Sequence, residues 1–89
     1  MVHHAVTQLA PDEVFDRAIA FFSSRVPLEA AFPEQRSAGH LVLRGQGGEE
    51  IAIAARSDQG VTRVRAATLM FDGTLRRFLV TLPVAEQPA

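Results

Sequence analysis

The spacing of apolar residues changes once along this chain of 89 residues, and the change limits what the chain can fold into. Between Val14 and Phe22, apolar residues recur every three to four positions, which is the spacing of an amphipathic helix. From His40 to Leu82 they recur mostly at every second position, which is typical of strands that bury one face. This order favours an α+β domain in which a helix precedes an antiparallel sheet.

The helix is expected to begin at Pro11 and to end near Arg25. Proline suits the first helical position because the N–H that it lacks has no partner inside a helix. Asp12 and Glu13 follow in the first turn, where the helix dipole favours negative charge. Pro27 disfavours helical geometry at the residue before it, so the helix should stop there.

Turn signals divide the rest of the chain. Residues 2–9 predict a first strand, and residues 26–37, which contain two prolines, are expected to form an irregular crossing segment. A glycine-rich turn at 45–48, a turn at 57–60 and a hairpin turn at Asp72-Gly73 separate the later strands. These turns predict strands at residues 40–44, 49–56, 61–71 and 75–82, the last closed by Pro83.

The predicted fold is α+β, with one amphipathic helix packed on a curved, mainly antiparallel five-stranded sheet, in the order strand, helix and then four strands. Residues 1–89 form a single domain, with 84–89 as a frayed tail. One helix covers about 200 Å², whereas five strands present about 600 Å² per face. Much of the sheet therefore needs another cover, and we expect a second copy of the chain to supply it as a two-fold homodimer.

The predicted turns set a register that assigns side chains to the two sheet faces. The face expected to dock the helix carries Ile51, Ile53, Ala55, Val64, Ala66, Thr68, Met70, Leu75, Arg77 and Leu79. The opposite face is expected to carry Ala52, Ala54, Ala67, Leu69, Phe71, Phe78, Val80 and Leu82 together with three arginines.

The candidate site is the cluster of Arg63, Arg65 and Arg76 beside Phe71 and Phe78 on that second face. Large apolar residues together with arginine are typical of the centres of protein interfaces. Three like charges on one sheet face repel each other unless an anion neutralises them. The arginines are therefore expected to pair with acidic residues across a dimer or to bind a carboxylate.

Other chemistry finds little support in the sequence. His3 and His4 point to opposite faces of one strand, and no carboxylate stands at ligand spacing to either of them or to His40, so no metal site is predicted. The chain has no cysteine, no serine in a nucleophile elbow and no phosphate-binding loop. We therefore predict no catalytic residue and no cofactor.

Charge and composition bear on partners and origin. The net charge of −1 provides no basic field for nucleic acid or for an anionic membrane, and no apolar run is long enough to span a bilayer. Because no secretory signal precedes the first strand, a cytoplasmic location is expected. All nine basic residues are arginine, which is typical of a bacterial genome rich in GC.

Residues Leu9-Ala10-Pro11-Asp12-Glu13-Val14-Phe15 resemble the start of the START-like helix-grip superfamily, SRPBCC. There, a strand runs into Pro-Glu-Glu-Val-Phe/Trp and a helix, before an antiparallel meander. The resemblance implies a curved sheet gripping one helix, while the long C-terminal helix that closes the ligand cavity in that superfamily has no counterpart among the predicted elements. No site residue is carried over.

Two interpretations of function remain open. One is a small homo-oligomeric interaction or ligand-holding module without catalysis of its own. The other is a helix-grip-like binder or enzyme of small hydrophobic molecules, with a cavity formed between subunits. A hydrophobic or anionic ligand fits either interpretation.

Overall fold

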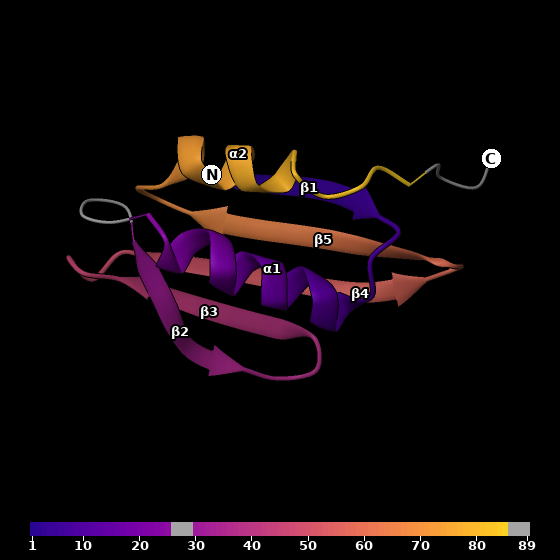
Figure 1. Cartoon of the computed structure of the whole chain (residues 1–89), viewed down its shortest axis with the longest axis horizontal. Coiled ribbons are helices and arrows are strands. Elements are labelled where there is room, and N and C mark those ends of the chain that lie inside the picture. The colour runs from indigo at the N-terminus through magenta and orange to yellow at the C-terminus, as the bar shows by residue number, and fades with distance from the viewer. Residues whose placement is uncertain (26–29, 86–89) are drawn as a thin grey trace.

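The computed structural model describes residues 1–25 and 30–85, which form a five-stranded antiparallel sheet with two helices on one face (Figure 1). The elements are β1 (Val2–Thr7), α1 (Pro11–Ser23), β2 (Ala31–Arg36), β3 (His40–Gly45), β4 (Glu50–Asp58), β5 (Val61–Thr68) and α2 (Asp72–Leu79). The strands lie in the order β1-β5-β4-β3-β2, so β4 runs along the middle of the sheet. The predicted α+β class and five-stranded antiparallel sheet are confirmed.

Helix α1 begins at Pro11 as predicted. The side chain of Glu13 accepts a hydrogen bond from the backbone N–H of Ala10 at 3.3 Å, which satisfies a donor at the start of the helix. The apolar side of α1 lies against the sheet, and its fully buried residues are Val14, Phe15, Ala18 and Phe22.

Helix α2 corrects the prediction of a hairpin turn at Asp72-Gly73 and a strand over residues 75–82. Phe71, Leu75, Phe78 and Leu82 recur at helical spacing, and each is at most 6% exposed. The ring of Phe78 lies 5.5 Å from that of Phe21 and 5.8 Å from that of Phe22, so α2 packs beside α1. Residues 75–82 fit both an alternating and a helical pattern. The helix prevails because it buries all four of these large side chains together.

Strand β2 corrects the prediction of an irregular segment over residues 26–37, of which 26–29 lie outside the described residues. It pairs with β3 at the edge of the sheet, and the register shifts between Pro33 and Gln35. An edge strand accepts proline because the N–H on its outer side needs no partner. The four strands that follow α1 are therefore β2 to β5.

The C-terminal segment also differs from the prediction of a frayed tail over residues 84–89. Val84 forms a bridge with Thr7, and the backbone N–H of Ala85 donates to the carbonyl of Val6 at 3.3 Å. These contacts tie the segment to the outer edge of β1. Residues 86–89 lie outside the described residues.

The turn between β4 and β5 has two residues rather than the predicted four. Gln59 and Gly60 have φ values of 52° and 85°, which suit a tight hairpin turn. Arg56 therefore pairs with Arg63 instead of Val61. Because side chains alternate with a period of two, a shift of two residues leaves each on its predicted face. Residues Ile51, Ile53, Ala55, Val64, Ala66 and Thr68 are accordingly buried under the helices.

The hydrophobic core lies between the helices and this face. Its largest fully buried side chains are Phe15, Phe22, Phe78, Leu41, Leu43, Ile51, Ile53 and Leu75. The chain exposes 5317 Å², close to the roughly 5,100 Å² expected of a compact monomer of its mass. One copy therefore completes its own core.

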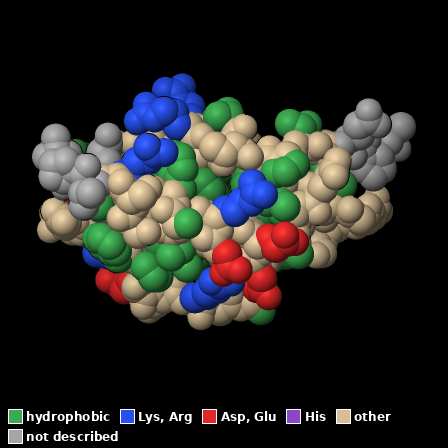
Figure 2. All heavy atoms as spheres, viewed as in Figure 1, with side chains coloured by type: hydrophobic (Ala, Val, Ile, Leu, Met, Phe, Trp, Pro, Cys, Tyr) green, Lys and Arg blue, Asp and Glu red, His purple; other side chains and the backbone are tan. Residues whose placement is uncertain are grey.

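The helix side of the molecule is well solvated. It carries positive and negative side chains next to each other among small apolar patches (Figure 2). Arg36, for example, lies 2.8 Å from the carboxylate of Asp16. Neither described helix is long and apolar enough to cross a membrane.

Candidate functional site

The sheet face opposite the helices has no cover within the described part of the chain. Along β4, the central strand, the side chains on this face are those of Glu50, Ala52, Ala54 and Arg56. An acid and a base thus stand about 20 Å apart with two alanines between them. We call this surface, formed by these four residues and their cross-strand neighbours, the open face.

Two rows of side chains cross the middle of the open face. The apolar row follows the pairing of four strands and contains Val2, Ala67, Ala52 and Val42. The next row, one step along the strands, is the basic row and contains His4, Arg65, Ala54 and His40. The alanine in the basic row leaves a gap between the arginine and the second histidine.

The acidic end of the open face comprises Glu34, Arg44 and Glu50. The Arg44 guanidinium donates to both carboxylate oxygens of Glu34, at 2.8 and 3.0 Å, and to Glu50 at 3.3 Å. The hydrogen bond from Arg44 lowers the pKa of Glu34 despite some desolvation. The side chain of Glu49 lies on the helix side, beside Gly45, and accepts the backbone N–H of Gly47 at 2.9 Å. Two carboxylates and one guanidinium therefore leave one net negative charge at this end.

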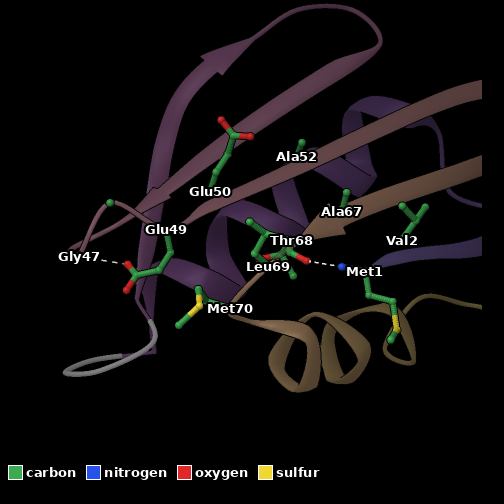
Figure 3. A pocket seen from close by; sticks show the side chains of 11 residues that line it. Met1, Val2, Gly47, Glu49, Glu50, Ala52, Ala67, Thr68, Leu69 and Met70 are labelled. Carbon is green, nitrogen blue, oxygen red and sulfur yellow. Dashed lines mark hydrogen bonds between the residues drawn. The ribbon is translucent and has the colours of Figure 1, made fainter.

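A hollow of about 600 Å³ opens beside the acidic end, and Figure 3 shows the side chains that line it. Met1, Val2, Leu69 and Met70 form most of its apolar wall, and all four are exposed. The amino group of Met1 donates to the carbonyl of Thr68 at 2.6 Å, which holds the first residue against the end of β5. The hollow is thus an apolar surface with carboxylates at its rim.

The basic end of the open face comprises Arg56, Asp58 and Arg63, and it lies next to Arg65 of the basic row. Arg63 is paired with Asp58 at 2.7 Å. Within residues 1–25 and 30–85, neither Arg56 nor Arg65 has a carboxylate at ion-pair distance, and both are exposed. Two guanidiniums and one carboxylate leave one net positive charge at the basic end, and Arg65 adds a second positive charge beside it. The open face is therefore negative at one end and positive at the other.

Two smaller hollows continue across the face. One of about 370 Å³ lies among His4, His40, Arg56, Arg63 and Arg65. Another of about 140 Å³ is lined by His40, Ala54 and Arg65 and reaches Ala52 and Ala67 of the apolar row. Because Ala52 and Ala67 also line the large hollow, the three hollows follow one another along the open face.

The predicted site cluster is brought together only in part. Arg63 and Arg65 lie on the open face as predicted, whereas Arg76 lies on α2. Phe71 and Phe78 are buried in the core on the other side of the sheet, so their predicted place beside the arginines is wrong. The helical conformation of residues 72–79 explains both differences. The missed feature is the spacing Glu-Ile-Ala-Ile-Ala-Ala-Arg in residues 50–56, which alternation alone could have revealed.

The histidines lie apart from one another. Nε2 of His3 is 2.9 Å from Oδ1 of Asp72 and links β1 to the start of α2. This hydrogen bond, helped by the charge of the chain's amino group, lowers the pKa of Asp72. His4 and His40 stand on the open face. No three histidine, aspartate or glutamate side chains of the described residues are grouped so that they could hold a metal ion.

Comparison of the chain with models of protein families, with curated proteins and with solved structures found no match. These comparisons neither support nor oppose the resemblance of residues 9–15 to the helix-grip superfamily.

Proposed function

We propose that the chain is a homodimeric interaction module whose two open faces pack on each other about a two-fold axis. The observation that carries the proposal is the self-complementary central strand. When a second copy of β4 lies antiparallel over the first, Glu50 faces the partner's Arg56 and Ala52 faces the partner's Ala54. The axis then passes between Ala52 and Ala54, parallel to the rows.

The size and relief of the open face suit this packing. Five strands present about 600 Å² in plan, which approaches the roughly 800 Å² per partner of a standard specific interface. The centre of the face is made of small side chains, Ala52, Ala54 and Ala67, so two sheets can approach to the usual distance of about 10 Å. The apolar row supplies the hydrophobic centre that such interfaces have.

Charge selects one orientation of the two copies. The proposed axis sets the acidic end of each copy over the basic end of its partner. An axis parallel to the strands would instead set like charges over each other, which is unfavourable. Complementary charges of this kind fix the orientation of partners more than they add to affinity.

The edges of the sheet favour the face as the contact surface. The outer edge strand β2 carries Pro33 and a shift in register, and both hinder the addition of another strand. The opposite edge is partly occupied by the bridge between Thr7 and Val84. Association of copies by strand addition is therefore disfavoured at both edges.

Charge reversal on β4 tests the proposal. Arg56→Glu sets carboxylate against carboxylate twice in the dimer, and Glu50→Arg sets guanidinium against guanidinium twice. Each variant alone is expected to sediment as a folded monomer, because one copy completes its own core. Mixed in equal amounts, the two variants are expected to form a heterodimer in which both contacts are matched.

The double variant Arg56→Glu with Glu50→Arg should likewise recover self-association. Arg17→Glu is the matched control, because it makes the same change of charge on the exposed side of α1 and should leave association unchanged. Sedimentation velocity at micromolar concentration measures each species. A wild-type protein that stays monomeric in every buffer, or a mixture that does not associate, would contradict the proposal.

A second candidate function is a helix-grip-like binder or enzyme of small hydrophobic molecules. One feature favours it: the short helix α2 follows the last strand, β5, as the long C-terminal helix follows the sheet in the superfamily. The space between helices and sheet is filled by Phe15, Phe22 and Phe78, so a cavity would have to form on the open face. A structure of the dimer with a lined chamber between the subunits would support this candidate.

A further inference from the structure

The proposed dimer leaves one positive charge on each subunit without a counter-charge. The outer charges are matched, since Arg56 faces the partner's Glu50. In the same arrangement, however, the basic row of each copy lies over the apolar row of the other, and Arg65 faces the partner's Ala67. A guanidinium removed from water against an apolar surface is strongly unfavourable unless an anion accompanies it.

No acidic side chain of residues 1–25 and 30–85 is placed to accompany Arg65. Among the described carboxylates of the open face, Asp58 is held by Arg63 at 2.7 Å and Glu34 by Arg44 at 2.8 Å. Glu50 is matched by the partner's Arg56 in the proposed dimer. Within the described part of the two chains, no carboxylate is left to supply the counter-charge.

We infer that each subunit of the dimer binds a small organic carboxylate with an apolar body at Arg65, and that this ligand promotes dimerisation. The inference rests on the proposed dimer. It names a binding site over Ala54, flanked by Arg65 on one side and His40 on the other. The ligand supplies the missing negative charge and is itself covered by the partner.

The geometry of the basic row fits such a ligand. Arg65 and His40 stand on strands separated only by β4, about 9.6 Å apart, and the methyl group of Ala54 leaves the space between them open. The planar guanidinium of arginine binds a carboxylate through two parallel hydrogen bonds. An imidazole on the far side of the gap offers a further nitrogen.

The residues around the proposed binding site limit the size of the ligand's apolar body. The hollow over Ala54 measures about 140 Å³ and extends from Arg65 to Ala52 and Ala67 of the apolar row. The carboxylate therefore lies at Arg65, and the body lies along the basic row over Ala54, toward His40. In the dimer the partner's apolar row covers the same body, which predicts a chain or ring of only a few carbons.

Hexanoate and hexanamide are the probes that test the inference. They have the same apolar body and differ in charge. Saturating hexanoate is expected to lower the dissociation constant of the wild-type dimer at least about tenfold, because a ligand that binds only the dimer shifts the equilibrium by mass action. Hexanamide at equal concentration and ionic strength should leave the constant unchanged. Sedimentation equilibrium measures both.

A variant that removes the charge of Arg65 tests the inference most directly. Arg65→Met keeps an apolar stem and removes the guanidinium, so its dimer should form without hexanoate at least as tightly as the wild-type dimer. It should also no longer respond to hexanoate. The matched control is Arg63→Met, because Arg63 has its own carboxylate, and this variant should keep the hexanoate response.

The outcomes separate the ligand from the dimer. If the charge-reversed pair assembles as proposed but hexanoate leaves the wild-type dissociation constant unchanged, the ligand inference is wrong and the dimer stands. If the monomeric Arg56→Glu variant binds hexanoate as tightly as the wild type, the linkage to dimerisation is wrong. If nothing associates with or without hexanoate, the dimer itself is wrong.

Discussion

The two faces of the sheet are built from alternate residues of the same strands, and they differ in the size of their side chains. Under the helices, β4 contributes Ile51 and Ile53, which are fully buried against large aromatic side chains. On the open face, the residues between and beside them are Ala52 and Ala54, bounded by a charge at each end. Large side chains fix the fold on one face, and small ones leave the other face able to receive a second surface. Position along the strand should therefore decide whether a substitution affects folding or the proposed association.

The largest expected effect tests whether α2 belongs to the covered face. Phe78→Ala should lower the free energy of unfolding by about 3–5 kcal/mol, because it empties a fully buried aromatic site between two other rings. Val80→Ala, at the residue directly after the helix, is the control, since Val80 is 81% exposed and its truncation should change stability by less than about 0.5 kcal/mol. Urea denaturation measures both. Equal effects of the two substitutions would show that α2 does not pack as described.

Adjacent residues of β4 give the next contrast. Ile53→Ala should cost about 2–5 kcal/mol of folding stability, because Ile53 is buried under the helices. Ala54→Val, one residue further, adds two methyl groups to the open face and should change folding stability by less than about 1 kcal/mol. The added bulk should weaken the proposed dimer, because it stands where the partner's Ala52 approaches. Urea denaturation measures the folding stability of both variants, and sedimentation measures their association. Unchanged association of Ala54→Val would place the dimer contact elsewhere.

Alternation was enough to predict which side chains of β4 and β5 share a face. Even an error of two residues in the register left Arg63 and Arg65 on the open face, because the period of a strand is two. The same reasoning failed for residues 71–82, where Phe71 and Phe78 fit a strand and a helix equally well. Only the gain from burying them beside α1 decides between the two.

The basic row could not be predicted for a different reason. His4 and His40 come beside Arg65 only because β1 pairs with β5 and β3 pairs with β4. The pairing of the first strand with the last joins residues far apart in the chain, and no local pattern encodes it. Strand β2 was not predicted because its sequence contains a proline and three polar residues. An edge strand tolerates such residues, since its outer side needs few apolar contacts.

The smallest expected effect concerns the contact that closes the edge between β1 and α2. The pKa of Asp72 is lowered, first by the hydrogen bond from His3 and then by the positive charges of the chain's amino group and Arg76. A carboxyl group whose pKa is lower in the folded state stabilises the fold above its unfolded pKa, near pH 4, and loses that contribution as the pH falls through the folded value. Asp72→Asn should therefore be less stable than the wild type at pH 5–7, and the difference should disappear in more acidic solution. In His3→Ala, where the largest cause is removed, NMR titration of the Asp72 carboxyl carbon should give a higher pKa than in the wild type. An unchanged pKa in that variant would show that the link between β1 and α2 does not set the ionisation of Asp72.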